Sequence, residues 1–134
     1  MRLPLIPPQE TDRVRRMSPL ELAFVGDGVH MLLTRVLLCD RDRRPNDLQR
    51  LSSLEVNANA QAAALEKILP RLTDEEQDIV RRGRNAHAHH SAPRSASPDA
   101  YSAATALEAL YGYLFLTGQA ERLEMLDLIG RGKE

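Results

Sequence analysis

Cysteine and aromatic residues are scarce in this chain of 134 residues, which has no tryptophan, three tyrosines, two phenylalanines and a single cysteine, Cys39. One cysteine excludes an internal disulfide and is typical of a protein of the reducing cytoplasm. No apolar run reaches the roughly 18 residues of a membrane-spanning helix. The proline-broken N-terminus is neither a signal peptide nor a membrane anchor. We therefore expect a cytoplasmic protein without a membrane partner.

Alternation of apolar and polar residues is also lacking, so the sequence predicts no strand and an all-α fold. Its 43% of apolar residues suits one globular domain over residues 1–134. The proline-rich residues 1–17 are expected to form an extended arm, and residues 85–97 a loop. Capping residues and helical spacing predict five helical regions: Pro19 to about Leu38, Asn46 or Asp47 to near Pro70, Thr73 to about Gly83, Ser97 to Leu116, and Ala120 to about Ile129.

Two lone carboxylates interrupt apolar helices. Asp27 lies within LELAFVGDGVHMLL and Glu108 within ATALEALYGYLFL. A charge in an apolar run is costly unless something stabilises it. If the two acids meet, they repel each other, and a divalent cation with a preference for oxygen ligands, Mg²⁺ or Mn²⁺, would relieve the repulsion. The alternative is that the two acids are separate and reach the solvent, as acids on helices usually do.

These same segments resemble a known family. SPLELAFVGDGVHMLL is similar to the signature helix of the ribonuclease III catalytic domain, and EALYGYLFL is similar to its second acidic motif. With GRNAHAHHSAP between them, the chain resembles the Mini-III ribonucleases, short relatives that have no double-stranded-RNA-binding domain. The resemblance extends from about Ser18 to Leu126. It implies a single ribonuclease III-like helical domain that works as a homodimer.

The resemblance assigns roles to individual residues. Gly26 and Asp27 match the end of the signature motif, and Glu108 matches the glutamate of the second motif. Asp27 and Glu108 are therefore the expected catalytic residues and metal ligands, with Mg²⁺ as the cofactor and Mn²⁺ as a substitute. Phe24 matches the phenylalanine that packs into the partner subunit, so we expect it at the dimer interface.

Three further acids of ordinary ribonuclease III enzymes are replaced here by Leu20, Ala23 and Thr105, as they are in Mini-III enzymes. This leaves the number of bound metals open. Thr105 lies one turn before Glu108, and its hydroxyl is a candidate to bind a metal-bound water; a packed threonine is the alternative. His30 follows Asp27 by three residues and is a candidate to support the site, with a core histidine as the alternative.

One concentration of positive charge adjoins the predicted loop. It comprises Arg81, Arg82, Arg84 and Arg94, with the polar Asn85 among them as a further candidate, and residues 81–97 contain no acid. Arginine suits phosphate, so we expect this segment to contact RNA. A solvated basic helix end would equally explain Arg81 and Arg82. The spacing of His87, His89 and His90 fits no common zinc pattern, so no zinc is expected.

The function implied by the resemblance is metal-dependent hydrolysis of double-stranded RNA to 5′-phosphate ends, in maturation of the large-subunit (23S) ribosomal RNA precursor. One alternative is a catalytically inert RNA-binding or ribosome-assembly protein on the same fold, which the low number of acids favours. Another is a helical dimer whose Phe24 face binds a protein partner, which would leave RRGRNA unexplained.

Overall fold

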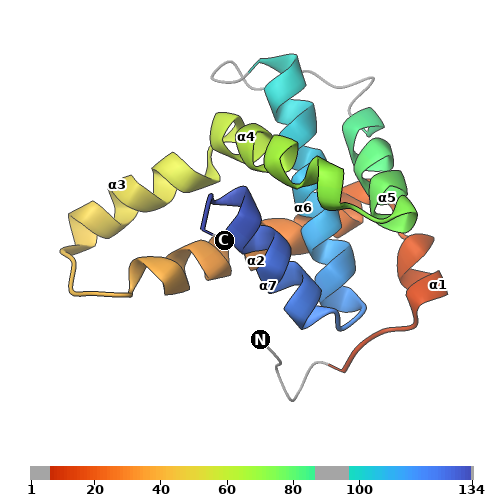
Figure 1. Cartoon of the computed structure of the whole chain (residues 1–134), viewed down its shortest axis with the longest axis horizontal. Helices are drawn as coiled ribbons and strands as arrows, with labels where there is room; N and C mark the ends of the chain where they lie inside the picture. The colour runs from red at the N-terminus through yellow and green to blue at the C-terminus, as the bar shows by residue number, and fades with distance from the viewer. Residues whose placement is uncertain (1–6, 87–96, 134) are drawn as a thin grey trace.

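The computed structural model describes residues 7–86 and 97–133, and every regular element in these two ranges is helical (Figure 1). The all-α prediction is therefore confirmed. The elements are α1 (Thr11–Arg15), α2 (Pro19–Leu38), α3 (Pro45–Val56), α4 (Ala58–Ile68), the short 3-10 helix η1 (Leu69–Arg71), α5 (Asp74–Asn85), α6 (Pro98–Leu116) and α7 (Ala120–Gly130). No helix in the described ranges combines the length and the hydropathy that crossing a bilayer requires.

Helix α6 is the centre of the fold. It contacts α2, α4, α5 and α7, which surround it in Figure 1. Its sequence is apolar on nearly all sides, and a helix of that kind is stable only when it is covered all round. Leu107, Leu110 and Leu114 are accordingly at most 1% exposed. Glu108 thus projects from the most enclosed helix of the domain.

Several predicted helix ends are confirmed, with their capping contacts. The Ser18 hydroxyl accepts a hydrogen bond from the backbone N–H of Leu20, and Thr73 forms a reciprocal capping box with Glu76. Ser97 caps α6. Gly118 ends α6 with a φ of 75°, a left-handed conformation that glycine adopts without strain.

Two predictions about the first half of the chain are wrong. Residues 11–15 of the expected extended arm form α1, because Val14 is completely buried in the core. The helical region expected up to near Pro70 is divided into α3 and α4 at Asn57, whose ψ of 160° breaks the helix and whose side chain caps α4 through the backbone N–H of Ala60. The first of these two helices also begins earlier than predicted, at Pro45.

The end of α5 is two residues later than predicted. Gly83 does not end the helix; a Cβ at this position would lie 2.7 Å from the Cα of Ala106, so the glycine allows α5 to pack closely on α6. Asn85, expected to start the loop, is the last residue of α5. Most of the expected loop, residues 87–96, lies outside the described residues.

Candidate active site

The site begins with two glycines where α2 and α6 cross. A Cβ at Gly26 would lie 1.6 Å from the carbonyl oxygen of Glu108, and a Cβ at Gly112 would lie 2.0 Å from that of Leu22. No side chain fits between backbones this close, so the crossing requires glycine at both positions. Asp27 directly follows Gly26, and Gly26 packs on Glu108 itself. The crossing therefore brings the two carboxylates together from opposite ends of the sequence.

Asp27 and Glu108 are close enough for their side chains to hydrogen-bond. Asp27 is exposed, whereas Glu108 is half-buried. Burial of Glu108, followed by its contact with Asp27, raises the pKa of Glu108 to about 8. Without a cation the pair therefore retains a proton near neutral pH. The structure thus brings the side chains of the two predicted acids into contact, while their catalytic role remains a prediction.

A divalent cation suits this pair of acids. Two adjacent carboxyl groups supply oxygen ligands, and a cation between them would replace the shared proton. In residues 7–86 and 97–133 no group of three or more histidine, cysteine, aspartate or glutamate side chains is placed to hold a metal. Water or an RNA phosphate would then complete the coordination sphere, as Mg²⁺ prefers.

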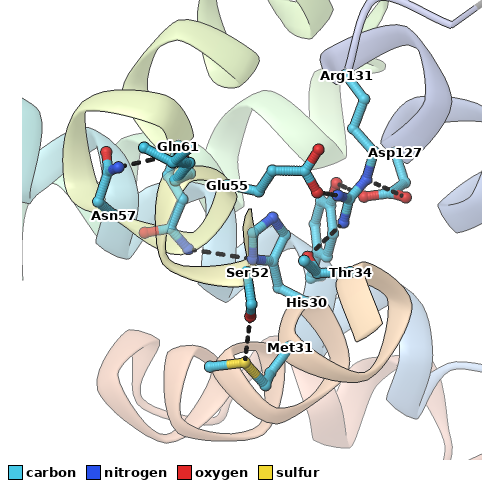
Figure 2. Close-up of polar contacts among 11 residues, drawn as sticks. His30, Met31, Thr34, Ser52, Glu55, Asn57, Gln61, Asp127 and Arg131 are labelled. Carbon is cyan, nitrogen blue, oxygen red and sulfur yellow. Dashed lines mark hydrogen bonds and ion pairs between the residues drawn. The ribbon is translucent and has the colours of Figure 1, made fainter. Parts of the chain in front are cut away.

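Gln61 on α4 is a third member of the site that sequence reasoning missed. It is 4% exposed, hydrogen-bonds to Glu108, and its Nε2 lies 3.5 Å from Nδ1 of His30 (Figure 2). The signal was present, because Gln61 shares the buried face of α4 with Leu65 and Ile68, at positions i, i+4 and i+7. A glutamine at such a core position requires hydrogen-bond partners.

The two predicted supporting residues differ in their relation to the acids. His30 is 4% exposed and reaches Glu108 through Gln61; burial lowers the pKa of His30 to about 4, so the ring is neutral. The hydroxyl of Thr105 is buried and donates to the carbonyl oxygen of Tyr101, at 3.1 Å. A contact of Thr105 with a metal-bound water stays a prediction.

A second buried polar cluster lies beside His30. The ring of His30 packs edge-on against Tyr111, with 5.4 Å between ring centroids. The Tyr111 hydroxyl donates to Asp127 at 2.6 Å, and Arg131 donates to the other oxygen of Asp127 at 2.8 Å. As Figure 2 shows, Arg131 also binds Glu55 and Thr34. We call Thr34, Glu55, Tyr111, Asp127 and Arg131 the arginine cluster.

The predicted RNA-binding residues have different partners. Arg82 donates to the backbone carbonyls of Arg15 and Met17, at 2.7 and 2.8 Å, and so holds the end of α1. Arg81 pairs with Asp78 on the same helix.

Arg84 lies 3.9 Å from Glu66, and Asn85 is exposed. Arg94 lies outside the described residues. RNA contact by this segment stays a prediction, and Arg82 already has a structural role.

Phe24 is the most exposed of the large apolar side chains described, at 76%. One turn further along α2 lies Gly28, where an added Cβ would meet nothing within 4 Å. Gly28 borders an apolar cavity of about 200 Å³, which is also lined by Val25, Leu32 and Phe115. A projecting aromatic ring and an apolar hollow thus lie on neighbouring turns of one helix.

Comparison with known proteins identifies the family. Residues 20–119 match the ribonuclease III domain. The chain is 50% identical over 123 residues to Mini-ribonuclease 3 of Symbiobacterium thermophilum, covering 87% of this chain and 94% of that protein. It is 42% identical to Mini-ribonuclease 3 of Synechocystis, covering 91% and 84%. A crystal structure of a Fusobacterium nucleatum protein matches with a TM-score of 0.78 and 30% identity, covering 88% of this chain and 93% of that one. The chain therefore belongs to the ribonuclease III family, as an endoribonuclease of the Mini-III type.

Proposed function

We propose that this protein is a magnesium-dependent endonuclease that cleaves double-stranded RNA to 5′-phosphate and 3′-hydroxyl ends, with Mn²⁺ able to replace Mg²⁺. The observation that carries the proposal is the contact between Asp27 and Glu108 in a ribonuclease III domain. Resemblance to the Mini-III type supports the large-subunit (23S) ribosomal RNA precursor as substrate and the cytoplasm as location.

In this proposal the chain's own residues hold the cation and the RNA. Asp27 and Glu108 bind the cation, and Glu108 must first release the proton that Asp27 and burial keep on it. When bound, the cation supplies a nucleophilic water near neutral pH and offsets charge on the phosphate. Packing of Gly83 on Ala106 holds the end of α5, with Arg84, against the helix that carries Glu108.

The direct test is a cleavage assay on a long RNA duplex, with the separated strands and a DNA duplex of the same sequence as controls. We expect cleavage of the RNA duplex alone, in Mg²⁺ or Mn²⁺ and not with a chelator, and products that a ligase accepts through their 5′-phosphates. Binding without cleavage in any divalent metal would favour the inert RNA-binding alternative.

The homodimer is part of the same proposal. Two copies related by a twofold axis present the same patch to each other, so Phe24 of each can enter the cavity at Gly28 of the other. Gly28→Leu would fill part of that space, and its Cβ would meet no atom within 4 Å. We expect Phe24→Ala and Gly28→Leu both to shift sedimentation toward monomer. A dimer that is equally tight in both variants would place the interface elsewhere.

The RNA surface is testable by salt dependence. Each lost phosphate contact lowers the slope of log affinity against log salt by about 0.7 to 0.9. We expect this change for Arg84→Ala. Arg82→Ala should instead lower stability, since it frees two backbone carbonyls near α1. An unchanged slope for Arg84→Ala would place the RNA on another surface.

A further inference from the structure

Gln61 connects three helices beside Asp27 and Glu108, which we call the acid pair. It lies on α4, its partner Glu108 is on α6, and its partner His30 is on α2. The side chain is 4% exposed, so water is not available to satisfy its amide. A buried amide of this kind has a fixed orientation, because turning it would leave its polar atoms without partners.

The hydrogen-bond donors and acceptors around Gln61 indicate how its side-chain amide is oriented between His30 and Glu108. Nε2 lies 3.5 Å from Nδ1 of His30, and Nδ1 of a neutral imidazole is an acceptor in the tautomer that carries the proton on Nε2. An amide NH₂ has two hydrogens, so in this tautomer it can donate both to His30 and to the Glu108 carboxylate, with which the Gln61 side chain hydrogen-bonds. Glutamate at position 61 has the same shape but no donor for either partner. These two contacts thus explain why position 61 is occupied by glutamine and not by glutamate.

His30 is itself held in place. Its ring packs on Tyr111, whose hydroxyl is fixed by Asp127 of the arginine cluster. The series from Asp127 to Glu108 therefore consists of buried, mutually oriented groups. Glu108 thus has one buried partner, Gln61, and one exposed partner, Asp27.

We propose that Gln61 is a positioning residue that holds the Glu108 carboxylate toward Asp27 for metal binding, and that His30 orients the Gln61 amide. This inference rests on the proposed function. Residues that hydrogen-bond to a metal ligand typically change metal affinity about 10- to 100-fold when they are replaced. Gln61→Met keeps the length of the side chain and removes both donors, so it isolates the hydrogen bonds.

The experiment measures Mn²⁺ affinity from the metal-dependent melting temperature, and the cleavage rate as a function of Mn²⁺. We expect Gln61→Met to raise the apparent Kd for Mn²⁺ about 10- to 100-fold. Cleavage should return to the parental kcat at saturating Mn²⁺. His30→Phe, which keeps the ring packing and removes the acceptor, should raise the Kd by a smaller factor. Gln77→Met is the matched control, because Gln77 lies on α5 and donates to the carbonyl oxygen of Leu72, and it should leave the Kd unchanged.

Each other outcome overturns the inference. If Gln61→Met melts at a lower temperature but keeps the parental Kd, Gln61 only supports the fold. If its kcat stays low at saturating Mn²⁺, Gln61 acts on something other than metal binding. If Gln61→Met does not fold, an unchanged Kd in His30→Phe refutes the arrangement. If the parent protein itself neither binds Mn²⁺ nor cleaves RNA, the proposed function fails as well, and that result is distinguishable from the others.

Discussion

Two carboxyl groups in the interior of this domain are held in opposite ways. Asp127 is 3% exposed, and its two oxygens accept hydrogen bonds from Tyr111 and Arg131. Glu108, by contrast, lies against a second acid, Asp27, and its pKa is raised to about 8. The arginine cluster contains its own counter-ion, whereas the two side chains that act on Glu108, Asp27 and Gln61, include no cation.

The difference separates stability from function. A fold can hold a buried ion pair without any ligand when all of its hydrogen bonds are made. Removing one partner then lowers the free energy of unfolding, because the other charge stays buried without a partner. Two carboxyl groups brought together at a glycine crossing cannot both be charged without cost, so the metal-free pair retains a proton, and a cation that takes its place is favoured. Variants of the two sites should therefore fail in different assays.

The largest effect should come from the acid pair. Asp27→Asn and Glu108→Gln keep the volume and remove the charge that binds the cation, so we expect each to slow cleavage about 10³-fold or more. Without metal, both should be at least as stable as the parent, because two carboxyl groups no longer share one site. Glu121→Gln, an exposed residue of α7, is the matched control. Cleavage near the parental rate in either variant would remove that residue from the mechanism.

The arginine cluster should show the reverse pattern. Arg131→Met leaves Asp127 buried without its cation, and breaking such a pair typically costs about 3–5 kcal/mol of the free energy of unfolding. Urea denaturation measures this loss. Arg50→Met, at an exposed pair with Asp47, should cost less than about 1 kcal/mol. The specific activity of folded Arg131→Met should fall far less than that of Asp27→Asn. A selective loss of cleavage with unchanged stability would mean that the cluster serves catalysis.

Stabilisation of the folded protein by a metal ion should depend on the acid pair and not on the arginine cluster. A cation that binds the folded state at about 100 times its Kd adds roughly 2.7 kcal/mol. For a domain of this size that raises the melting temperature by several degrees, on the order of 10 °C at most. Arg131→Met should keep this response and Asp27→Asn should lose it. Equal responses in the two variants would place the metal away from Asp27.

The sequence predicted the acid pair better than the cluster. Asp27 and Glu108 stand out because each is a lone charge in an apolar helix, and the adjacent glycine is visible in the motif. Asp127 and Arg131 lie in a charged C-terminal segment, where exposed residues have the same appearance. Their burial depends on where α7 packs in the folded domain, and the spacing of residues along the sequence does not predict that position.

The helix boundaries show the same limit. Thr73 and Ser97 were predictable because a cap is a local interaction. The break at Asn57 was missed because the apolar spacing continues through it, although asparagine is a good capping residue. The sequence predicts a helix end at Gly83, because glycine often ends helices; its role in close packing on Ala106 depends on a neighbour that is distant in sequence.

The smallest effect expected is a dependence of stability on pH in the metal-free protein. The folded state keeps the Glu108 proton up to a pKa of about 8, whereas the unfolded chain loses it near 4.5. Stability from this group is thus fully present below pH 4.5 and is lost as pH rises toward 8. His30 acts in the opposite sense: its pKa is lowered to about 4, so its contribution is present above pH 6.5 and lost as pH falls toward 4.

Between pH 6.5 and 8 the Glu108 contribution is therefore separated from that of His30, and subtracting the curve of Glu108→Gln removes the background. We expect the difference in unfolding free energy, parent minus variant, to fall with pH by no more than one proton, about 1.4 kcal/mol per pH unit. Mn²⁺ should reverse this slope, because the cation binds the deprotonated pair. Parallel curves for parent and variant, with and without Mn²⁺, would show that Glu108 has the same pKa in the folded and the unfolded chain. In that case the acid pair, like the arginine cluster, would be stable without a bound proton or cation.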